Sequence, residues 1–423
     1  MKKHRSVNRC LFVGSGSGEA CDSDPEPQTP DPLKIAVVGF GMAGATSAYL
    51  LAKAGHAVTL FERSPVVGAV GAGILLQMSG QAILRHLGVL DRILAHAAPI
   101  DELHAVHVGG RDLIRNRYGL YAEGCRAYGL HRGVLFQVLE NLVDSSGVAV
   151  RLGIEIAGRI RKADGTVDVT DTAGQSHGPF DFIVCGDGAR SQLRPVLGQR
   201  QYSWKYSHGT LWAITPGMPV RGQLFQVVKG TKYLCGLVPM GDGLTTLYWG
   251  IPNGEYNAIR NRGIAALKEE IVEFCPQAQE CTDHLFDFDQ LLFTNYQHNY
   301  MSRRFDRNIV FLGDASHAMS PHLGQGVNLA MVDAWMLAGA LADAPTPLEG
   351  FRLFERRQRG YQRYYSAATF FLSPFFQSDW PILGWGRDRF LPWMPRIPIL
   401  RRQMLMTVAG LKGGFLKGAR DFS

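Results

Sequence analysis

The sequence feature that most constrains this chain is a glycine pattern between two short apolar runs. Residues 35–38 read Ile-Ala-Val-Val, and residues 39–44 read Gly-Phe-Gly-Met-Ala-Gly. A helix-forming segment follows and stops at Gly55, and a second apolar run, 57–61, ends in Glu62. The order of strand, glycine turn, helix, strand and acid predicts a βαβ unit that binds a dinucleotide.

Each part of this unit has a mechanical role. Gly39 permits the tight turn, Gly41 lets the backbone approach a pyrophosphate, and Gly44 lets the helix lie close to the strand. The unpaired N–H groups of the helix N-terminus favour phosphate binding. Glu62 can accept hydrogen bonds from ribose hydroxyls, and its charge would repel a 2′-phosphate. The tight ligand is therefore expected to be FAD or NAD rather than NADP.

Two later motifs repeat the arrangement of a buried strand followed by glycine and acid. The apolar run 182–185 leads into Gly-Asp-Gly at 186–188, which is expected to open a helix, and a third strand leads into Gly-Asp at 313–314. The segment 321–328, Pro-His-Leu-Gly-Gln-Gly-Val-Asn, then precedes a further helix. These added motifs favour FAD over NAD as the tight ligand.

In this order and at these separations, the three motifs resemble those of the FAD-dependent aromatic hydroxylases of the para-hydroxybenzoate hydroxylase type, also called group A flavoprotein monooxygenases. The resemblance covers about residues 34–365. It implies tightly bound FAD, NAD(P)H as a transient co-substrate, and O2 that hydroxylates a small aromatic substrate through a flavin C4a-hydroperoxide. The implied substrate is a phenol or a quinone precursor.

The same resemblance implies roles for individual positions. Glu62 would bind the adenosine ribose, Arg63 would lie beside the adenine, and Asp314 would bind near the ribityl chain. Arg132 would contact the diphosphate or ribityl chain, unless it is an ordinary surface arginine at a helix start. Residues 324–328 would present helix N-terminal N–H groups to the negative edge of reduced flavin. The full set of expected cofactor-binding residues is Gly39, Gly41, Met42, Ala43, Gly44, Glu62, Arg63, Arg132, Asp187, Gly188, Asp314, Pro321, Gly324, Gln325, Gly326, Val327 and Asn328.

The expected fold is α/β: a Rossmann-like FAD-binding domain with an interleaved antiparallel-sheet substrate domain and a C-terminal helical extension. Residues 1–33, rich in Gly, Ser, Pro and acid, are expected to form a flexible extension. The FAD-binding domain is expected over 34–200 and 301–350, the substrate domain over 201–300, and the C-terminal extension over 351–423.

The stretch between the second and third motifs has a different residue pattern, which is typical of an antiparallel sheet. Four strand-like segments, 209–215, 223–228, 233–238 and 245–251, are bounded by Gly and Pro, and a helix is expected over 264–274. In the resembling family such a sheet covers the flavin and binds substrate. The aromatic residues that could line a substrate site are Trp212, Phe225, Tyr233, Tyr248 and Trp249, although each is more commonly a core residue between sheet and helix.

Activation of a phenol needs a base whose pKa lies near the working pH. His322, inside the turn that would border the flavin, and His208, at the start of the presumed substrate sheet, are the candidates by type and position. Pro321 would lie beside the flavin ring in the same chamber. His317 is expected to orient the loop after Asp314. The alternative for each histidine is a structural or solvent-exposed side chain.

Three other interpretations stay open at this point. A flavin-dependent halogenase would carry a Trp-x-Trp-x-Ile-Pro motif, which residues 248–252, Tyr-Trp-Gly-Ile-Pro, only approach. A flavoprotein that oxidises or reduces its substrate without oxygen insertion fits the same motifs. A non-enzymatic flavin-bound sensor or scaffold would leave the substrate sheet unexplained.

The net charge of +7 belongs to the C-terminal part of the chain. Residues 351–423 contain 13 Lys and Arg against four Asp and Glu, and residues 361–415 interleave aromatic with basic side chains. Prolines divide this segment into short helices. It is expected to be either a helical cap on the FAD domain or a surface that rests on an anionic membrane and admits a lipophilic substrate. No nucleic-acid-binding module is visible, so nucleic acid is not an expected partner.

Seven widely spaced cysteines without a CxxC pattern indicate a reducing compartment and no metal site. There is no run of 18 apolar residues, and the N-terminal apolar run is too short for a signal peptide. The protein is therefore expected in the cytoplasm, with contact to the inner membrane face as an option. The sequence leaves its oligomeric state open.

Overall fold

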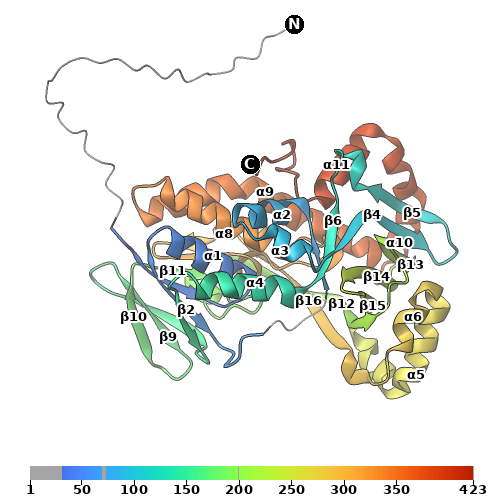
Figure 1. Ribbon diagram of the computed structural model, residues 1–423, viewed down its shortest axis with the longest axis horizontal. Coiled ribbons are helices and arrows are strands. Elements are labelled where there is room, and N and C mark those ends of the chain that lie inside the picture. The colour runs from blue at the N-terminus through green and yellow to red at the C-terminus, as the bar shows by residue number, and fades with distance from the viewer. Residues whose placement is uncertain (1–30, 69–72, 199, 423) are drawn as a thin grey trace, which may run out of the picture. The chain divides into compact units, whose positions relative to one another are not determined.

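The computed structural model describes residues 31–68, 73–198 and 200–422. The expected flexible extension, 1–33, lies outside the described residues except for positions 31–33. Residues 33–423 form one compact unit, and its helices and strands are labelled in Figure 1. It is a mixed α/β structure, as predicted.

A six-stranded sheet carries all three motifs. Its strands, in spatial order, are β17 (Phe305–Asp306), β18 (Ile309–Phe311), β11 (Phe182–Cys185), β1 (Lys34–Val38), β2 (Ala57–Glu62) and β7 (Ala149–Leu152). Neighbouring strands are parallel except for β17 and β18. The carboxyl ends of β1, β2, β11 and β18 therefore meet at one edge, which is where ligands bind in sheets of this kind.

Side-chain alternation along β1 explains the layers on the two faces of this sheet. Ile35 and Val37 are fully buried in the core shared with the helices. Ala36 and Val38 point the other way, into the core shared with a three-stranded sheet. The helical layer consists of α1 (Met42–Lys53), α2 (Met78–His86), α3 (Leu90–Leu94), α4 (Arg132–Asp144), α8 (Gly326–Ala342) and the start of α9 (Pro347–Phe376), and the small sheet of β8 (Ile156–Arg161), β9 (Val167–Asp171) and β10 (Ser176–Phe180).

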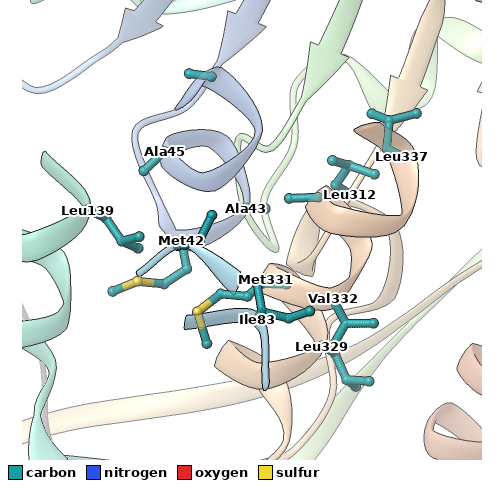
Figure 2. Close-up of a cluster of buried hydrophobic side chains, with 14 of the residues drawn as sticks. Met42, Ala43, Ala45, Ile83, Leu139, Leu312, Leu329, Met331, Val332 and Leu337 are labelled. Atoms are coloured by element: carbon teal, nitrogen blue, oxygen red, sulfur yellow. The ribbon is translucent and has the colours of Figure 1, made fainter. Parts of the chain in front are cut away.

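The centre of the helical layer is a dense apolar cluster. Figure 2 shows Met42, at the start of α1, beside Met331 of α8 and Ile83 of α2. All three side chains are 4% exposed or less. The side chains at the start of α1 are thus packed in the core, so that this end of the helix presents its backbone to the edge where the motifs meet.

A second, mostly antiparallel sheet has nine strands. They are β16 (Leu292–Met301), β12 (Gln201–Pro216), β15 (Leu244–Pro252), β14 (Tyr233–Gly241), β13 (Gly222–Lys229), β4 (Ala98–His107), β6 (Ala127–His131) and β3 (Gly73–Leu76), with β5 (Asp112–Arg117) paired to β4. The four strands expected between 209 and 251 are present. The sheet is larger than expected because β4 pairs in parallel with β13 and brings residues 73–131 into it.

The outer face of this sheet is covered by α5 (Tyr256–Phe274) and α6 (Gln279–Asp283), as Figure 1 shows. The helix expected over 264–274 starts eight residues earlier, at Tyr256. It bends at Gly263, whose φ of 85° only glycine adopts readily. The prediction therefore found the second half of a bent helix.

One predicted helix is absent. The Gly-Asp-Gly motif was expected to open a helix, but it is followed by turns and a single 3-10 turn at Arg194–Leu197. Asp187 accepts a hydrogen bond from the backbone N–H of Gln192 (3.0 Å), and Pro195 has no N–H to donate. Both features favour a compact turn over a helix.

The C-terminal part is helical. After α9 come α10 (Pro381–Phe390), a 3-10 segment η7 (Leu391–Arg396) and α11 (Pro398–Val408), each of the three helices starting with proline. Figure 1 shows α10 and α11 on the side of β5, which both η7 and α11 contact. No helix in the described part of the chain is long and apolar enough to cross a membrane.

Candidate active site

The motif-bearing edge of the six-stranded sheet borders a cavity of about 170 Å³. Gly39, Gly41 and Glu62 line it from the β1–α1 turn and the end of β2, and Asp187 and Gly188 line it from the turn after β11. Arg63, which follows Glu62, also borders it. The first two motifs therefore build one site, as parallel pairing of their strands requires. We call this space the motif cavity.

The three glycines of the first motif differ in what a side chain would meet. A Cβ on Gly44 would lie 1.8 Å from the carbonyl oxygen of Gly39. A Cβ on Gly39, whose φ is +97°, would lie 2.5 Å from the carbonyl oxygen of Gly186. A Cβ on Gly41 would meet no atom within 4 Å. Gly39 and Gly44 therefore serve the packing of the chain, whereas Gly41 keeps space open toward the motif cavity.

The start of α1 has the properties of an anion site. Gly41 caps the helix without a side-chain hydrogen bond, and the first turn contains no acid. Because the first N–H groups of a helix lack intrahelical acceptors, residues 42–44 offer donors and a partial positive charge. The side chains of Met42 and Ala43 are buried, so these residues contribute through the backbone alone. The cradle fits a pyrophosphate.

The carboxylates of the motif cavity are held by short contacts. Glu62 accepts hydrogen bonds from the backbone N–H of Phe40 (2.7 Å) and of Ser64 (2.9 Å). The Cys185 thiol donates to Asp187 over 3.0 Å, because burial and the Asp187 charge raise the pKa of that thiol well above its usual value. Both carboxylates thus have fixed positions.

Arg132 lies apart from this arrangement. It is the first residue of α4, and it lines neither the motif cavity nor the second cavity described next. Its neighbour His131 caps α4 by accepting a hydrogen bond from the backbone N–H of Gly133 over 3.0 Å. The geometry therefore leaves the alternative for Arg132, a surface arginine at a helix start, in place.

A second cavity of about 280 Å³ lies between the start of α8 and the nine-stranded sheet. We call it the reaction chamber. On one side it is lined by Asp314 and by residues 319–327, and on the other by residues of β3, β4, β12, β13, β14 and β15. Six of the expected cofactor-binding residues meet here: Asp314, Pro321, Gly324, Gln325, Gly326 and Val327.

A buried charge network holds the turn that carries Asp314. Asp333 of α8 accepts hydrogen bonds from the backbone N–H of Gly313 (3.1 Å) and from His317 Nε2 (2.6 Å). Arg304, only 1% exposed, lies 3.5 Å from Asp333. Burial alone would raise the pKa of Asp333, but His317 and Arg304 outweigh it and hold that pKa below its usual value. Asp314 is left exposed at the chamber.

The turn before α8 is held in place by Gly324 and Asn328 and leaves the start of the helix open to a ligand. Gly324 has a φ of +61°, in the region that favours glycine. Asn328 uses its amide within the protein: it accepts from Gln77 N (2.9 Å) and donates to Leu75 O and Gly324 O (3.0 Å each). The start of α8 has no side-chain cap and no acid in its first turn, so its first backbone N–H groups are available to a ligand.

The two candidate bases occupy different positions. His322 lines the reaction chamber, whereas His208 lies on β12 and lines no part of it. Burial, and then the nearby His208 charge, lowers the pKa of His322 to about 4. Burial is also the main cause that lowers the pKa of His208. Both rings are therefore neutral at pH 7, but only His322 faces the chamber.

The hydrogen bonds of two neighbouring serines show which ring nitrogen of His322 carries the hydrogen. Ser373 donates to the carbonyl of Thr369 (2.7 Å), so the 2.5 Å contact between Ser320 and Ser373 takes the hydrogen of Ser320. His322 Nδ1, 2.9 Å from Ser320 Oγ, must then be the donor. His322 Nε2, which is buried without a hydrogen-bond partner, carries the lone pair.

Strand alternation sorts the aromatic candidates of the nine-stranded sheet. Trp212 and Tyr248 are paired across β12 and β15, have ring centroids 5.3 Å apart, and line the reaction chamber. Phe225, Tyr233 and Trp249 point to the opposite face and pack under α5. Chamber residues that sequence reasoning missed include Leu75, Thr210, Leu224, Gln226, Thr246 and Gln377. Side chains two positions apart on a strand point to the same face, so Thr210 and Thr246 could have been predicted from Trp212 and Tyr248. No sequence pattern predicts Gln377.

Comparisons with known proteins extend these observations. A protein-family model described as FAD binding domain matches residues 32–347. Kynurenine 3-monooxygenase of Christiangramia forsetii is 28% identical over 326 residues, which cover 72% of this chain and 71% of that protein. The 3-amino-4-hydroxybenzoate 2-monooxygenase of Streptomyces cremeus is 27% identical, covering 76% of this chain and 82% of that protein.

The fold also matches a solved structure. Klebsiella pneumoniae HpxO, crystallised with FAD and uric acid, superposes with a TM-score of 0.77 at 20% sequence identity. The match covers 89% of this chain and 97% of that one. The arrangement of the two sheets and their helices is therefore shared with a protein whose structure holds FAD.

Proposed function

The chain belongs to the FAD-binding domain family, and from this premise we propose that FAD spans the motif cavity and the reaction chamber. The chain is an FAD-dependent monooxygenase that acts on aromatic substrates, like the relatives to which it is similar. The observation that carries the placement is that α1 and α8 each present an uncapped, acid-free N-terminus to a cavity lined by motif residues.

The residues divide between the two ends of the cofactor. At the motif cavity, the N–H groups of residues 42–44 would bind the pyrophosphate, and Glu62 would bind the adenosine ribose. Asp314 would bind the ribityl chain, and the N-terminus of α8 would stabilise negative charge on the flavin edge. When bound, FAD supplies electron transfer from NAD(P)H and the activation of O2.

We assign His322 the role of the base that receives the substrate's phenolic proton. Its Nε2 lone pair is buried without a partner at the chamber and is therefore free to accept that proton. Burial lowers the pKa of the ring to about 4, and the negative charge of a phenolate formed beside Nε2 would raise that pKa toward the working pH. Ser320, which accepts from Nδ1, holds the ring in place and stabilises the charge that develops. The walls of Trp212 and Tyr248 exclude water from the transfer.

The test begins with the purified protein, which should be yellow and should oxidise NADH or NADPH faster when the right phenol is present. The product should contain one oxygen atom from O2, which separates this activity from oxidation without oxygen insertion. His322→Gln should keep its FAD and lose about a hundredfold or more in turnover. His208→Gln is the matched control and should keep most activity. A colourless protein that cannot be reconstituted with FAD would overturn the proposal.

The C-terminal surface supports contact with an anionic membrane. Of the 20 large apolar side chains exposed in the described residues, 11 lie between 370 and 416. A groove of about 400 Å³ between β5 and η7 is bordered by Arg111, Arg115, Arg389 and Arg396. Trp393 lies in the same groove, with the Arg396 guanidinium 4.3 Å from its ring. Basic and aromatic side chains together favour a bilayer surface.

Sedimentation with vesicles tests this contact. The protein should bind vesicles of anionic phospholipid at low salt, and binding should weaken as salt screens the charges. Vesicles of neutral phospholipid are the control. Protein that stays in the supernatant with anionic vesicles at low salt would remove the membrane contact and leave the monooxygenase activity untouched.

A further inference from the structure

A cavity larger than the reaction chamber lies beside it in the described structure. A space of about 740 Å³ lies between the nine-stranded sheet and the C-terminal helices, walled by side chains of β4, β5, β13, the turn at 321–323, α9, α10, η7 and α11. Ligand sites for small molecules commonly measure about 300–1,000 Å³. The C-terminal part therefore encloses a space that is itself large enough for a ligand. We call it the C-terminal cavity.

The C-terminal cavity and the reaction chamber are neighbours that share walls. Leu103, Gln226, His322 and Leu323 line both. His322 thus lies at the junction, with its unpartnered Nε2 between an aromatic-walled chamber and the larger space. The two cavities therefore adjoin at His322, so a ring that lies beside His322 in the chamber has the larger space next to it.

The wall chemistry favours hydrocarbon. Most lining residues are Leu, Ile, Val, Met, Phe or Ala. Several polar groups in the wall bond within the protein: Tyr364 Oη contacts Thr407 Oγ1 (2.5 Å), Thr407 donates to the Gln403 carbonyl (2.7 Å), and Tyr248 donates to Gln226 (3.1 Å). Asn116 Oδ1 is an exception, because it is buried in the wall without a hydrogen-bond partner. A polar ligand would find few free partners here, whereas an apolar one would be removed from water.

A second dinucleotide does not fit this wall. Arg387 is the one lysine or arginine among the lining residues. It donates to the carbonyl oxygens of Gly230 (2.9 Å) and Phe375 (2.8 Å) and pairs with Asp388 (2.6 Å). Because Asp388 neutralises the charge of Arg387, the lining residues offer no unpaired lysine or arginine to a pyrophosphate.

The outer wall joins this cavity to the exposed apolar surface. Phe390 lines the cavity and is also 65% exposed. Trp393 and Ile399, which flank the lining residues Met394 and Leu400, are 56% and 68% exposed. The segments that enclose the cavity therefore carry apolar side chains on both sides, an arrangement suited to passing a lipid-like chain inward.

We propose that the C-terminal cavity binds the hydrocarbon tail, alkyl or isoprenoid, of an amphipathic aromatic substrate whose ring lies in the reaction chamber beside His322. This inference rests on the proposed function, because it names the substrate class of that site. A 150 Å³ cavity holds one benzene, or roughly 25 Å³ per carbon, so a tail of about 10–20 carbons fits. Burial of each methylene should tighten binding about two- to fourfold.

The test measures binding without turnover. The FAD-loaded protein is titrated with 11-(dansylamino)undecanoic acid, a fluorescent chain probe, and the probe is displaced by 4-methyl-, 4-butyl-, 4-octyl- and 4-dodecylphenol. Affinity should rise steeply along this series in the wild-type protein. A flat series, or no probe binding, would overturn the proposal.

Cavity-filling variants locate the binding. In Leu400→Trp/Met404→Trp, two lining residues one turn apart on α11 are enlarged, and the dependence on chain length should disappear while 4-methylphenol binding and FAD content stay unchanged. Arg402→Trp, an exposed position on the same helix, is the matched control and should keep the full dependence. If the double variant loses FAD, the milder Ala368→Leu on α9 should still reduce the slope of the series. An unchanged slope in the filled variants would place the chain elsewhere and overturn the proposal.

The two proposals fail differently. Steep chain-length dependence without NAD(P)H oxidation by any phenol would refute the proposed function and leave the tail site standing. Oxidation stimulated equally by 4-methylphenol and 4-dodecylphenol, with a flat binding series, would keep the function and refute the tail site.

Discussion

The motif cavity and the C-terminal cavity are built by opposite means. The first is shaped by backbone: Gly39 and Gly44 bring chain segments so close that a single Cβ would collide, and Gly41 leaves the gap. The second is shaped by the volumes of side chains from eight elements, several of them far apart in the sequence. A site made of backbone tolerates almost no change, whereas a cavity made of side chains can be reshaped by substitution without loss of the fold.

The sharpest test of this contrast is Gly44→Ala. Its Cβ would lie 1.8 Å from the carbonyl oxygen of Gly39, which is backbone and cannot move without displacing β1. We expect a loss of at least about 3 kcal/mol in unfolding free energy, measured by denaturant titration. Gly41→Ala, with open space at its Cβ, is the control and should unfold like the wild type. Equal stability of the two variants would break the comparison.

Gly41→Val should separate cofactor binding from folding. Its side chain enters space that no protein atom occupies, so the free energy of unfolding without cofactor should change little beyond the glycine replacement itself. The same side chain would occupy the position of the pyrophosphate. FAD affinity should fall about a hundredfold, or about 2.7 kcal/mol, as measured by flavin fluorescence quenching. Wild-type affinity in this variant would mean that the cofactor does not approach Gly41.

What the sequence could predict follows the same division. The three glycine and acid motifs, the four strands β1, β2, β11 and β18 and the α/β class were predictable, because a tight backbone turn demands particular residues at fixed spacing. The two edge strands β7 and β17 were not predicted. The turn after Asp187 was not, because its outcome depends on the local competition between a side-chain hydrogen bond and a helix.

The reaction chamber was predictable only in part. The turn at 321–327 was expected there, and both Trp212 and Tyr248 were among five aromatic candidates. Sequence alone did not separate these two from Phe225 or Trp249, because the parity of a strand is fixed only when one of its residues is placed. The C-terminal cavity left no local pattern, since it depends on which distant side chains meet.

Acid should weaken the packing of the C-terminal helices around the C-terminal cavity before it affects the motif cavity. Burial lowers the pKa of His322 and of His298 to about 4, and the nearby His317 charge contributes for His298. Both histidines connect the rest of the protein to α9. His298 Nε2 lies 3.0 Å from Ser366 Oγ of that helix. His322 acts through Ser320, which is hydrogen-bonded to it and contacts Ser373 of the same helix.

The sign follows from the direction of these shifts. Between pH 6.5 and pH 4 the unfolded chain binds more protons than the folded one, so stability present above pH 6.5 is lost as the pH falls toward 4. We expect about 1–2 kcal/mol for each histidine, below the limit of about 3 kcal/mol set by the full shift. His298→Gln and His322→Gln should each flatten the profile of unfolding free energy against pH. The exposed His284→Gln is the control, and equal slopes in all variants would contradict the assignment.

The smallest expected effect lies at the outer surface, where Arg396→Gln removes one basic group beside Trp393. Near an anionic bilayer one such charge contributes about 1 kcal/mol, so partition into anionic vesicles should fall about fivefold at low salt. Partition into neutral vesicles and the melting temperature should not change, because an exposed side chain away from the core contributes little to folding. Arg352→Gln, an exposed position near the start of α9, removes the same charge far along the sequence and serves as the matched control. If both substitutions weaken binding equally, net charge alone drives the contact, and the surface formed by α10, η7 and α11 has no special part in it.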